Sequence, residues 1–273
     1  QNNTFEKTLL ELNKQAEEAV REGYVHIILS DKNLSKDRVA LPMILATSSV
    51  HSHLIRQNLR TYMKKYPLVL FLHGAGERGS DNQSQLTHGS ALFANPGMRN
   101  AFPAIVIFPQ CPKDSYWANV DVDRSNYPIG ITFHPDQKPT PHLKMAGELV
   151  SSFIEEGKVD TSRVYIAGLS MGGMGTYEMV QRHPDTFAAA IAICGAGSTE
   201  PVKNYALKTP FWIIHGADDN VVKPTYSLQM ANAMLEAGAR PRVTVYEHAN
   251  HNSWDPAFAE PDFLQWLFSH TKN

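Results

Sequence analysis

The sequence predicts an α/β protein in which a mostly parallel central sheet is covered by helices on both faces. Two observations carry this prediction: short runs that are apolar throughout, and helical patterns that lie between them. Continuous apolar runs are typical of strands buried on both faces, and alternation of strands with helices predicts parallel pairing with right-handed crossovers. The expected strands are 68–72, 104–108, 164–167, 187–193, 211–214 and 243–246, and the expected helices are 142–156, 171–182, 226–237 and 262–269.

Length and composition favour one globular domain over residues 1–273. Of the 273 residues, 42 % are apolar and 19 % charged, as in ordinary globular domains. No stretch reaches the roughly 18 consecutive apolar residues of a membrane span. The net charge is −2 and no basic cluster stands out, so nucleic acid is a poor candidate partner. The oligomeric state is left open.

The first quarter of the chain follows a different pattern. Residues 1–23 are predicted to form an amphipathic helix packed on the domain, because leucines and charged residues recur at helical spacing from Thr4 to Arg21. Residues 24–29 and 39–46 are predicted strands, and 50–66 gives no clear pattern. The chain starts at Gln1 with a polar segment and no Met. Either a signal peptide has been removed or the sequence has been trimmed, and the polar start would suit a mature exported protein, periplasmic or extracellular.

Neither the cysteines nor the histidines suggest a metal or another cofactor. Cys111 and Cys194 each follow a predicted strand, and two cysteines define neither a disulfide framework nor a Cys-rich metal site. We expect free thiols, because a bridge needs Cα atoms within roughly 7 Å and these two strands are not expected to be neighbours. Histidines and acidic residues lack convincing ligand spacing.

The strongest chemical signal is the segment Gly168-Leu169-Ser170-Met171-Gly172-Gly173, between a predicted strand and a predicted helix. A nucleophilic serine needs a base to take its proton and must stand clear of the sheet. A sharp strand-to-helix turn exposes it, and small residues at Gly168 and Gly172 allow the tight packing that this turn requires. Ser170 is therefore the predicted nucleophile, with an ordinary glycine-rich turn as the alternative.

An acid and then a base are expected to follow the nucleophile along the chain. His251 is the favoured base, because a loop beyond the last predicted strand could bend it back towards Ser170. His248 directly follows that strand and suits a polar strand end. Asp219 is favoured over Asp218 as the acid that orients the imidazole and stabilises its charged form.

An oxyanion hole needs backbone N–H donors about 3 Å from the developing oxyanion. Met171, directly after the predicted nucleophile, is the first expected donor. Ala75 is the second, because it lies in the turn that follows the strand 68–72. A plain turn after a strand is the alternative for Ala75.

Substrate contacts are expected around these residues. Residues 111–141 are rich in Pro, Asp, Tyr and Asn, and long loops of this kind are often functional. We expect them to overhang the carboxyl edge of the sheet and cover the substrate. Trp117 and Trp254 are candidate substrate-binding residues, with packing of the catalytic loops as an equal alternative. Glu77 and Arg78 either pair and brace the oxyanion loop or meet a polar substrate.

Taken together, these segments resemble the α/β-hydrolase esterases described as predicted peptidases or phospholipase/carboxylesterase-like proteins. The resemblance runs from about Tyr66 to the C-terminus and leaves 24–66 unmatched. It implies the α/β-hydrolase fold, Ser170 as nucleophile, Asp219 as acid and His251 as base, and it supports Ala75 and Met171 as oxyanion donors. Feruloyl and acetyl-xylan esterases and polyhydroxybutyrate depolymerases share this layout. The matching segments are 66–79, 109–112 followed by Trp117, 168–173, 215–219 followed by 221–222, and 251–254.

The expected function is carboxylic-ester hydrolysis through an acyl-enzyme, without a cofactor. Small acyl or aryl esters, including carbohydrate-linked ones, are the expected substrates. One alternative is a serine peptidase or acyltransferase that uses the same three residues. An alternative of another class is a non-catalytic binding protein on a hydrolase scaffold.

Overall fold

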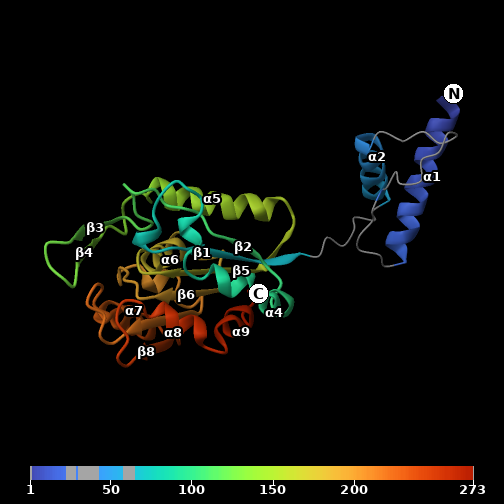
Figure 1. The fold of residues 1–273 in the computed structure, drawn as a ribbon. Coiled ribbons are helices and arrows are strands. Elements are labelled where there is room, and N and C mark those ends of the chain that lie inside the picture. Colours follow the sequence, from blue (N-terminus) through green and yellow to red (C-terminus); the bar gives the residue numbers. More distant parts are fainter. Residues whose placement is uncertain (1, 23–28, 30–42, 58–64, 273) are drawn as a thin grey trace. The chain divides into compact units, whose positions relative to one another are not determined.

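The computed structural model describes residues 2–22, 29, 43–57 and 65–272 (Figure 1). The chain divides into two compact units, Gln1–Lys65 and Tyr66–Asn273, where the sequence analysis expected one domain over 1–273. The two units have separate apolar clusters, which accounts for the division. Among the described residues, no helix combines the length and the apolar character needed to cross a bilayer.

The first unit contains two helices, α1 (Asn2–Arg21) and α2 (Met43–Arg56). A helix is present where 1–23 predicts one, but it belongs to a separate unit, whereas the prediction had it packed on a single domain. Ala16 of this helix is buried with Val50 and Leu54 of α2. Helix α2 replaces the end of the strand expected at 39–46, because its buried residues Ala46, Val50 and Leu54 recur every four positions, the spacing of one helix face. Residues 24–28 and 39–42 lie outside the described residues.

The second unit is built on a parallel sheet with strand order β2-β1-β5-β6-β7-β8. All six predicted strands are confirmed, with shifts of a few residues at their ends. The central strands are buried on both faces, so apolar side chains are required at every position. The strands are β1 (Tyr66–Leu72), β2 (Ile105–Ile107), β5 (Val159–Leu169), β6 (Ala189–Ile193), β7 (Phe211–Gly216) and β8 (Arg242–Tyr246).

Helices cover both faces of this sheet, and the predicted layering is confirmed. Helices α5 (Pro141–Glu155), α6 (Met171–Arg182) and α7 (Pro224–Glu236) pack in one apolar cluster. Helices α8 (Trp254–Ala259) and α9 (Phe263–Phe268) border the cluster on the other face. In Figure 1, α5 and α9 lie on opposite sides of β1 and β5.

Several short elements were not predicted. Helices α3 (Ser90–Ala94) and α4 (Pro96–Ala101) precede β2. There are also three short 3₁₀ helices among the described residues: η1 (Ala75–Glu77), η2 (Ser84–Leu86) and η3 (Val202–Asn204). Elements of three to six residues span too few turns to produce a periodic pattern. The long helices and buried strands, by contrast, were predictable from that pattern.

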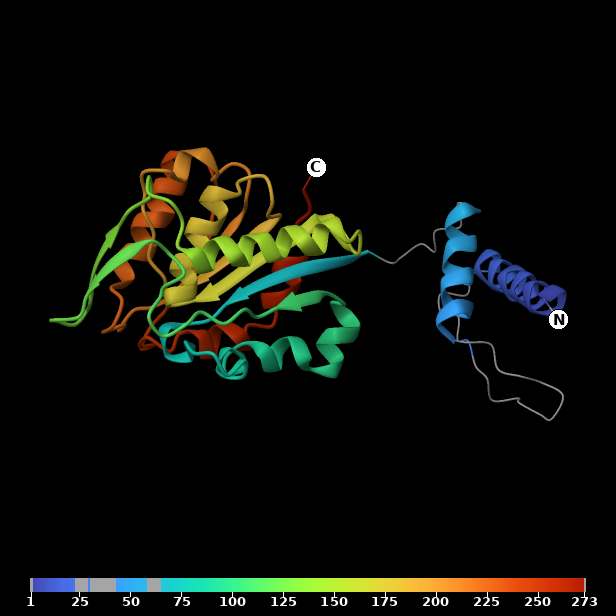
Figure 2. The ribbon, with the colours of Figure 1, turned by 90° about the horizontal axis from the view of Figure 1, so that it is seen from above.

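The segment 111–141 contains an antiparallel hairpin of β3 (Val120–Asp123) and β4 (Gly130–Phe133). Figure 2 shows this hairpin projecting beyond the carboxyl ends of the sheet strands. Its Ile129 N–H donates to the carbonyl of Val221, 2.8 Å away, in the loop after β7. The hairpin is thereby joined to the carboxyl edge, where the sequence analysis expected this segment to lie.

The register of β1 and β5 brings the two chemically distinctive loops together. Leu72, the last residue of β1, pairs with Gly168 of β5. The turn that begins at His73 and the turn that carries Ser170 therefore leave the sheet side by side. Cys111 and Cys194 are buried free thiols, as predicted.

Candidate active site

The turn from β5 to α6 holds Ser170 in a backbone conformation that side chains rarely adopt. Its φ is 54° and its ψ is −117°, a strained combination of the kind found at functional turns. The Ser170 N–H donates to the carbonyl of Ile193 at 2.8 Å, which anchors the turn to β6. A Cβ on Gly168 would collide with the backbone of Gly172. Glycine at Gly168 therefore permits the close strand–helix packing that exposes Ser170.

Ser170, His251 and Asp219 form one hydrogen-bonded chain. Ser170 Oγ lies 2.8 Å from His251 Nε2, and His251 Nδ1 lies 2.7 Å from Asp219 Oδ2. The carboxylate accepts, so Nδ1 carries a proton and Nε2 of the neutral ring is free to accept from the serine hydroxyl. The structure thus brings together the three residues that the sequence analysis favoured, with the tautomer that a serine nucleophile needs.

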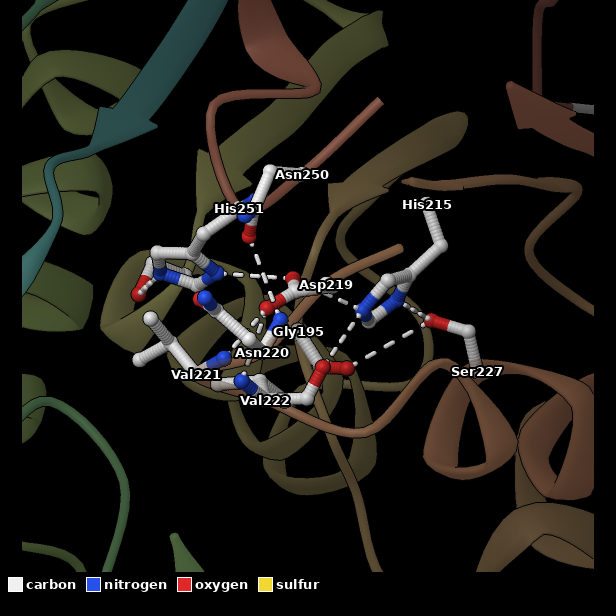
Figure 3. Close-up of polar contacts among 10 residues, drawn as sticks. Gly195, His215, Asp219, Asn220, Val221, Val222, Ser227, Asn250 and His251 are labelled. Carbon is white, nitrogen blue, oxygen red and sulfur yellow. Dashed lines mark hydrogen bonds and ion pairs between the residues drawn. The ribbon is translucent and has the colours of Figure 1, made fainter. Parts of the chain in front are cut away.

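Asp219 is held by more than His251. Its Oδ1 accepts from the N–H groups of Val221 at 2.8 Å and Val222 at 2.9 Å. Its Oδ2 also lies 3.1 Å from Nε2 of His215, whose side chain is fully buried (Figure 3). Burial alone would raise the pKa of Asp219, but the hydrogen bonds from His215 and His251 outweigh it and hold that pKa well below its usual value.

Sequence reasoning gave His215 no role. It is the fifth residue of β7 and stands four positions before Asp219. A histidine inside an otherwise apolar buried strand, shortly before the predicted acid, is the signal that could have identified it. Buried polar side chains need partners, and the nearest expected partner was that acid.

The competing residues His248 and Asp218 are at the surface. His248 Nδ1 lies 3.8 Å from Asp218 Oδ2, and the two side chains are 84 % and 62 % exposed. They contact each other rather than Ser170. Neither residue takes part in the hydrogen-bonded chain of Ser170, His251 and Asp219.

The two expected oxyanion donors line the same cavity as Ser170. Met171 is the first residue of α6, so its N–H has no acceptor within the helix. Ala75 is the first residue of η1. Arg78 braces this loop by donating from Nε to the Ala75 carbonyl at 2.9 Å and from a terminal nitrogen to the Ser115 carbonyl at 3.1 Å.

Trp254 and Trp117 have different surroundings. Trp254 lines the cavity, and its ring stands edge-on to His251 with centroids 5.6 Å apart. Trp117 does not line the cavity, because its side chain is 1 % exposed and its indole N–H donates to the His73 carbonyl at 3.0 Å. For Trp117 the structure favours the packing alternative over substrate binding.

Glu77 and Arg78 also have different contacts. Arg78 stacks over the ring of Tyr116 at 4.9 Å and braces the loop through backbone carbonyls, not through Glu77. Glu77 lines the cavity, and its Oε1 lies 3.7 Å from Nε2 of His88. The expected Glu77–Arg78 pair is thus replaced by separate contacts, and Glu77 alone of the two faces the cavity.

The cavity measures about 250 Å³, and the segment 111–141 forms part of its wall. Tyr116, Arg124 and Ile129 come from this segment. Arg124 donates to the Tyr116 hydroxyl at 2.7 Å. The expectation that this segment overhangs the site agrees with these contacts, although no sequence pattern singled out the three residues.

Within the described part of the chain, one cluster has the spacing of metal ligands: Cys194, Asp219 and His251. Burial raises the pKa of the Cys194 thiol, whereas a metal ligand must be the thiolate. His251 already contacts both Ser170 and Asp219. These residues therefore suit proton transfer better than metal binding.

A parallel sheet with helices on both faces, and a sharp turn between β5 and α6 that exposes Ser170, define an α/β-hydrolase fold. Residues 60–265 match the phospholipase/carboxylesterase family, and the chain belongs to this family. Its N-terminal part differs: residues 1–66 match the glutamate synthase central domain. The two matches meet at 60–66, where the boundary between the two compact units also falls.

Individual proteins show the same division. A solved thermostable esterase has a TM-score of 0.68 and 36 % identity, covering 76 % of this chain and 56 % of that one. The bifunctional acetylxylan esterase/xylanase XynS20E of Neocallimastix patriciarum is 26 % identical over 157 residues, which are 57 % of this chain and 20 % of that protein. The glutamate synthase [NADPH] large chain of Azospirillum brasilense is 50 % identical over 54 residues, 20 % of this chain and 4 % of that protein. The chain thus spans a small part of these two curated relatives.

Proposed function

We propose that this protein hydrolyses carboxylic esters through an acyl-enzyme, with Ser170 as the nucleophile. The observation that carries the proposal is the 2.8 Å contact between Ser170 Oγ and His251 Nε2, backed by the 2.7 Å contact from His251 Nδ1 to Asp219. A base that touches the nucleophile and is itself oriented by a carboxylate is the arrangement that serine acyl transfer needs.

The first half of the reaction forms the acyl-enzyme. His251 Nε2 takes the proton of Ser170 as Oγ attacks the ester carbonyl, and Asp219 stabilises the charged imidazole. The backbone N–H groups of Ala75 and Met171 donate to the oxyanion of the tetrahedral intermediate. His251 then gives its proton to the leaving alcohol, and the C–O bond of the ester breaks.

The second half repeats these steps with water. His251 takes a proton from a water molecule that attacks the acyl carbonyl, the same two N–H groups hold the oxyanion, and the proton returns to Ser170 Oγ as the acid leaves. No cofactor takes part in this proposal, because each proton passes between His251 and Ser170, the leaving alcohol or water.

For the substrate we propose a small acyl or aryl ester, with carbohydrate-linked esters included. A cavity of about 250 Å³ lined by Met174, Ile129 and Trp254 suits a small apolar or aromatic acyl group. The similar protein XynS20E is a bifunctional acetylxylan esterase/xylanase, which supports an ester attached to carbohydrate.

The proposal is tested by replacing Ser170 with Ala and measuring hydrolysis of p-nitrophenyl acetate, p-nitrophenyl butyrate and a feruloyl ester. Ser152→Ala, on an exposed position of α5, is the matched control. The parent and the control are expected to react with a fluorophosphonate probe and to turn over at least one ester, and Ser170→Ala to do neither while remaining folded. Turnover that survives in Ser170→Ala would contradict the assignment.

A further inference from the structure

We propose that His215 is a positioning residue, which fixes the Asp219 carboxylate in the orientation that receives His251. This inference rests on the proposed function, because it extends the same hydrogen-bonded chain by one imidazole. His215 comes from β7 and His251 from the loop before α8. Figure 3 shows the two imidazoles on opposite sides of the Asp219 carboxylate.

The contacts of His215 are complete and buried. Its Nε2 lies 3.1 Å from Asp219 Oδ2 and 3.0 Å from the Val222 carbonyl. Its Nδ1 lies 2.7 Å from Ser227 Oγ, and that oxygen is 3.4 Å from the Gly195 carbonyl. The side chains of His215 and Asp219 are both fully buried, so water does not compete for these contacts.

These contacts fix which nitrogen carries the proton. Both partners of Nε2, a carboxylate and a carbonyl, can only accept, so Nε2 donates. The hydroxyl of Ser227 can donate or accept, and it therefore accommodates Nδ1 in either protonation state. His215 thus keeps an N–H between the Val222 carbonyl and Asp219 Oδ2, whether its ring is neutral or charged.

Both oxygens of the Asp219 carboxylate therefore have partners. One oxygen of Asp219 is held by the N–H groups of Val221 and Val222, and the other receives His251 and His215. Without His215, that second oxygen would keep only the contact to His251. Small errors in the placement of catalytic groups are costly to the rate, which gives this buried contact a consequence for turnover.

Cys194, the residue after β6, also lies near Asp219: among the described residues, its Sγ and one ligand atom each of Asp219 and His251 lie within 4.8 Å of one another. Burial raises the pKa of this thiol, so it adds no charge. Removing the His215 N–H would leave Oδ2 a stronger acceptor for His251 Nδ1. A stronger acceptor favours the charged form of His251, so the acid limb of kcat/KM would move to higher pH.

The test compares His215→Leu, which removes the donor, with His215→Gln, whose amide N–H reaches to about the same place as Nε2. Steady-state kinetics and the pH profile of kcat/KM are measured on p-nitrophenyl acetate with the full chain. The Leu variant is expected to lose about 10-fold or more in kcat with little change in KM, and its acid limb to shift to higher pH. The Gln variant is expected to recover most of kcat and to keep the parent's acid limb.

Equal losses in the Leu and Gln variants with an unmoved acid limb would overturn the inference, since His215 would then only fill space. An unchanged kcat in Leu would overturn it as well. If the Leu variant does not fold, Ser227→Ala replaces it in the test, because Ser227 contacts His215 Nδ1. This variant is expected to lose less kcat than the Leu variant would. An unchanged kcat in Ser227→Ala would refute the positioning role of His215. Ser170→Ala in the same assay separates the two proposals, because activity that survives there refutes the proposed function instead.

Discussion

Gly172, the second residue of α6, lies against the backbone carbonyl of Leu72 at the end of β1. A Cβ at Gly172 would lie closer to this carbonyl than the 3.0 Å that real Cβ atoms respect. The contact joins the helix that follows Ser170 to the strand that precedes the oxyanion loop. The absence of a side chain at Gly172 therefore permits the close approach of α6 to the end of β1.

Gly172→Ala is expected to destabilise the second unit by about 1–3 kcal/mol or more, because the new methyl group meets backbone that cannot move without disturbing the sheet. Urea denaturation followed by circular dichroism measures the loss. Gly76→Ala is the matched control, since nothing lies within 4 Å of a Cβ built there. Similar stabilities for the two variants would contradict the close approach.

The pair His251 and His248 gives a second prediction. His251→Ala is expected to lower kcat/KM for p-nitrophenyl acetate by on the order of 10³-fold or more, because Ser170 loses its base. His248→Ala is expected to stay within about 2-fold of the parent, since exposed surface substitutions have small effects and the His248 side chain is 84 % exposed. A large loss in His248→Ala with an active His251→Ala would exchange the two roles.

The sequence predicted the sheet and the long helices because burial on both faces of β1, β5, β6 and β7 requires apolar residues throughout. It also selected Ser170, Asp219 and His251, since their chain order and strand-end positions follow from the fold. The sequence did not predict that Arg124 and Ile129 line the cavity, because their position there depends on how the β3–β4 hairpin packs against the loop after β7.

The N-terminal unit could not be distinguished from the hydrolase by composition. Its helix α1 has an ordinary amphipathic pattern. Such a pattern predicts that one face is buried, but it does not predict which element covers that face. In the structure that face meets α2 through Ala16 and Val50. The division at Lys65 was therefore not predictable from periodicity.

The Asp219 carboxylate makes the free energy of unfolding depend on pH in the acid range. Its pKa is held below its usual value in the folded chain by His215 and His251, against the effect of burial, and it returns to about 3.9 on unfolding. A carboxylate of this kind contributes stability that is fully present above the unfolded pKa and is lost as the pH falls towards the folded one. Below about pH 4, the free energy of unfolding of the parent should therefore fall more steeply than that of Asp219→Asn.

The measurement is a series of urea denaturation curves for both proteins between neutral pH and pH 3. Above about pH 5 Asp219 is ionised in both the folded and the unfolded parent, so its own titration adds no further change to the difference in unfolding free energy. Parallel curves down to the lowest pH would show that Asp219 is not held in its charged form.

The two tryptophans near the site should separate stability from substrate affinity. Trp117 is 1 % exposed under the oxyanion loop and hydrogen-bonded to His73, so Trp117→Ala should cost about 3–5 kcal/mol of unfolding free energy, as large-to-small core substitutions do. Trp254 lines the cavity beside His251, so Trp254→Ala should raise KM for a feruloyl ester more than for an acetyl ester, with a smaller loss of stability. Thermal unfolding and kinetics on both esters decide between these roles. A Trp117→Ala variant with the stability of the parent and a raised KM would instead assign Trp117 to substrate binding, because removing a packing residue leaves a destabilising cavity.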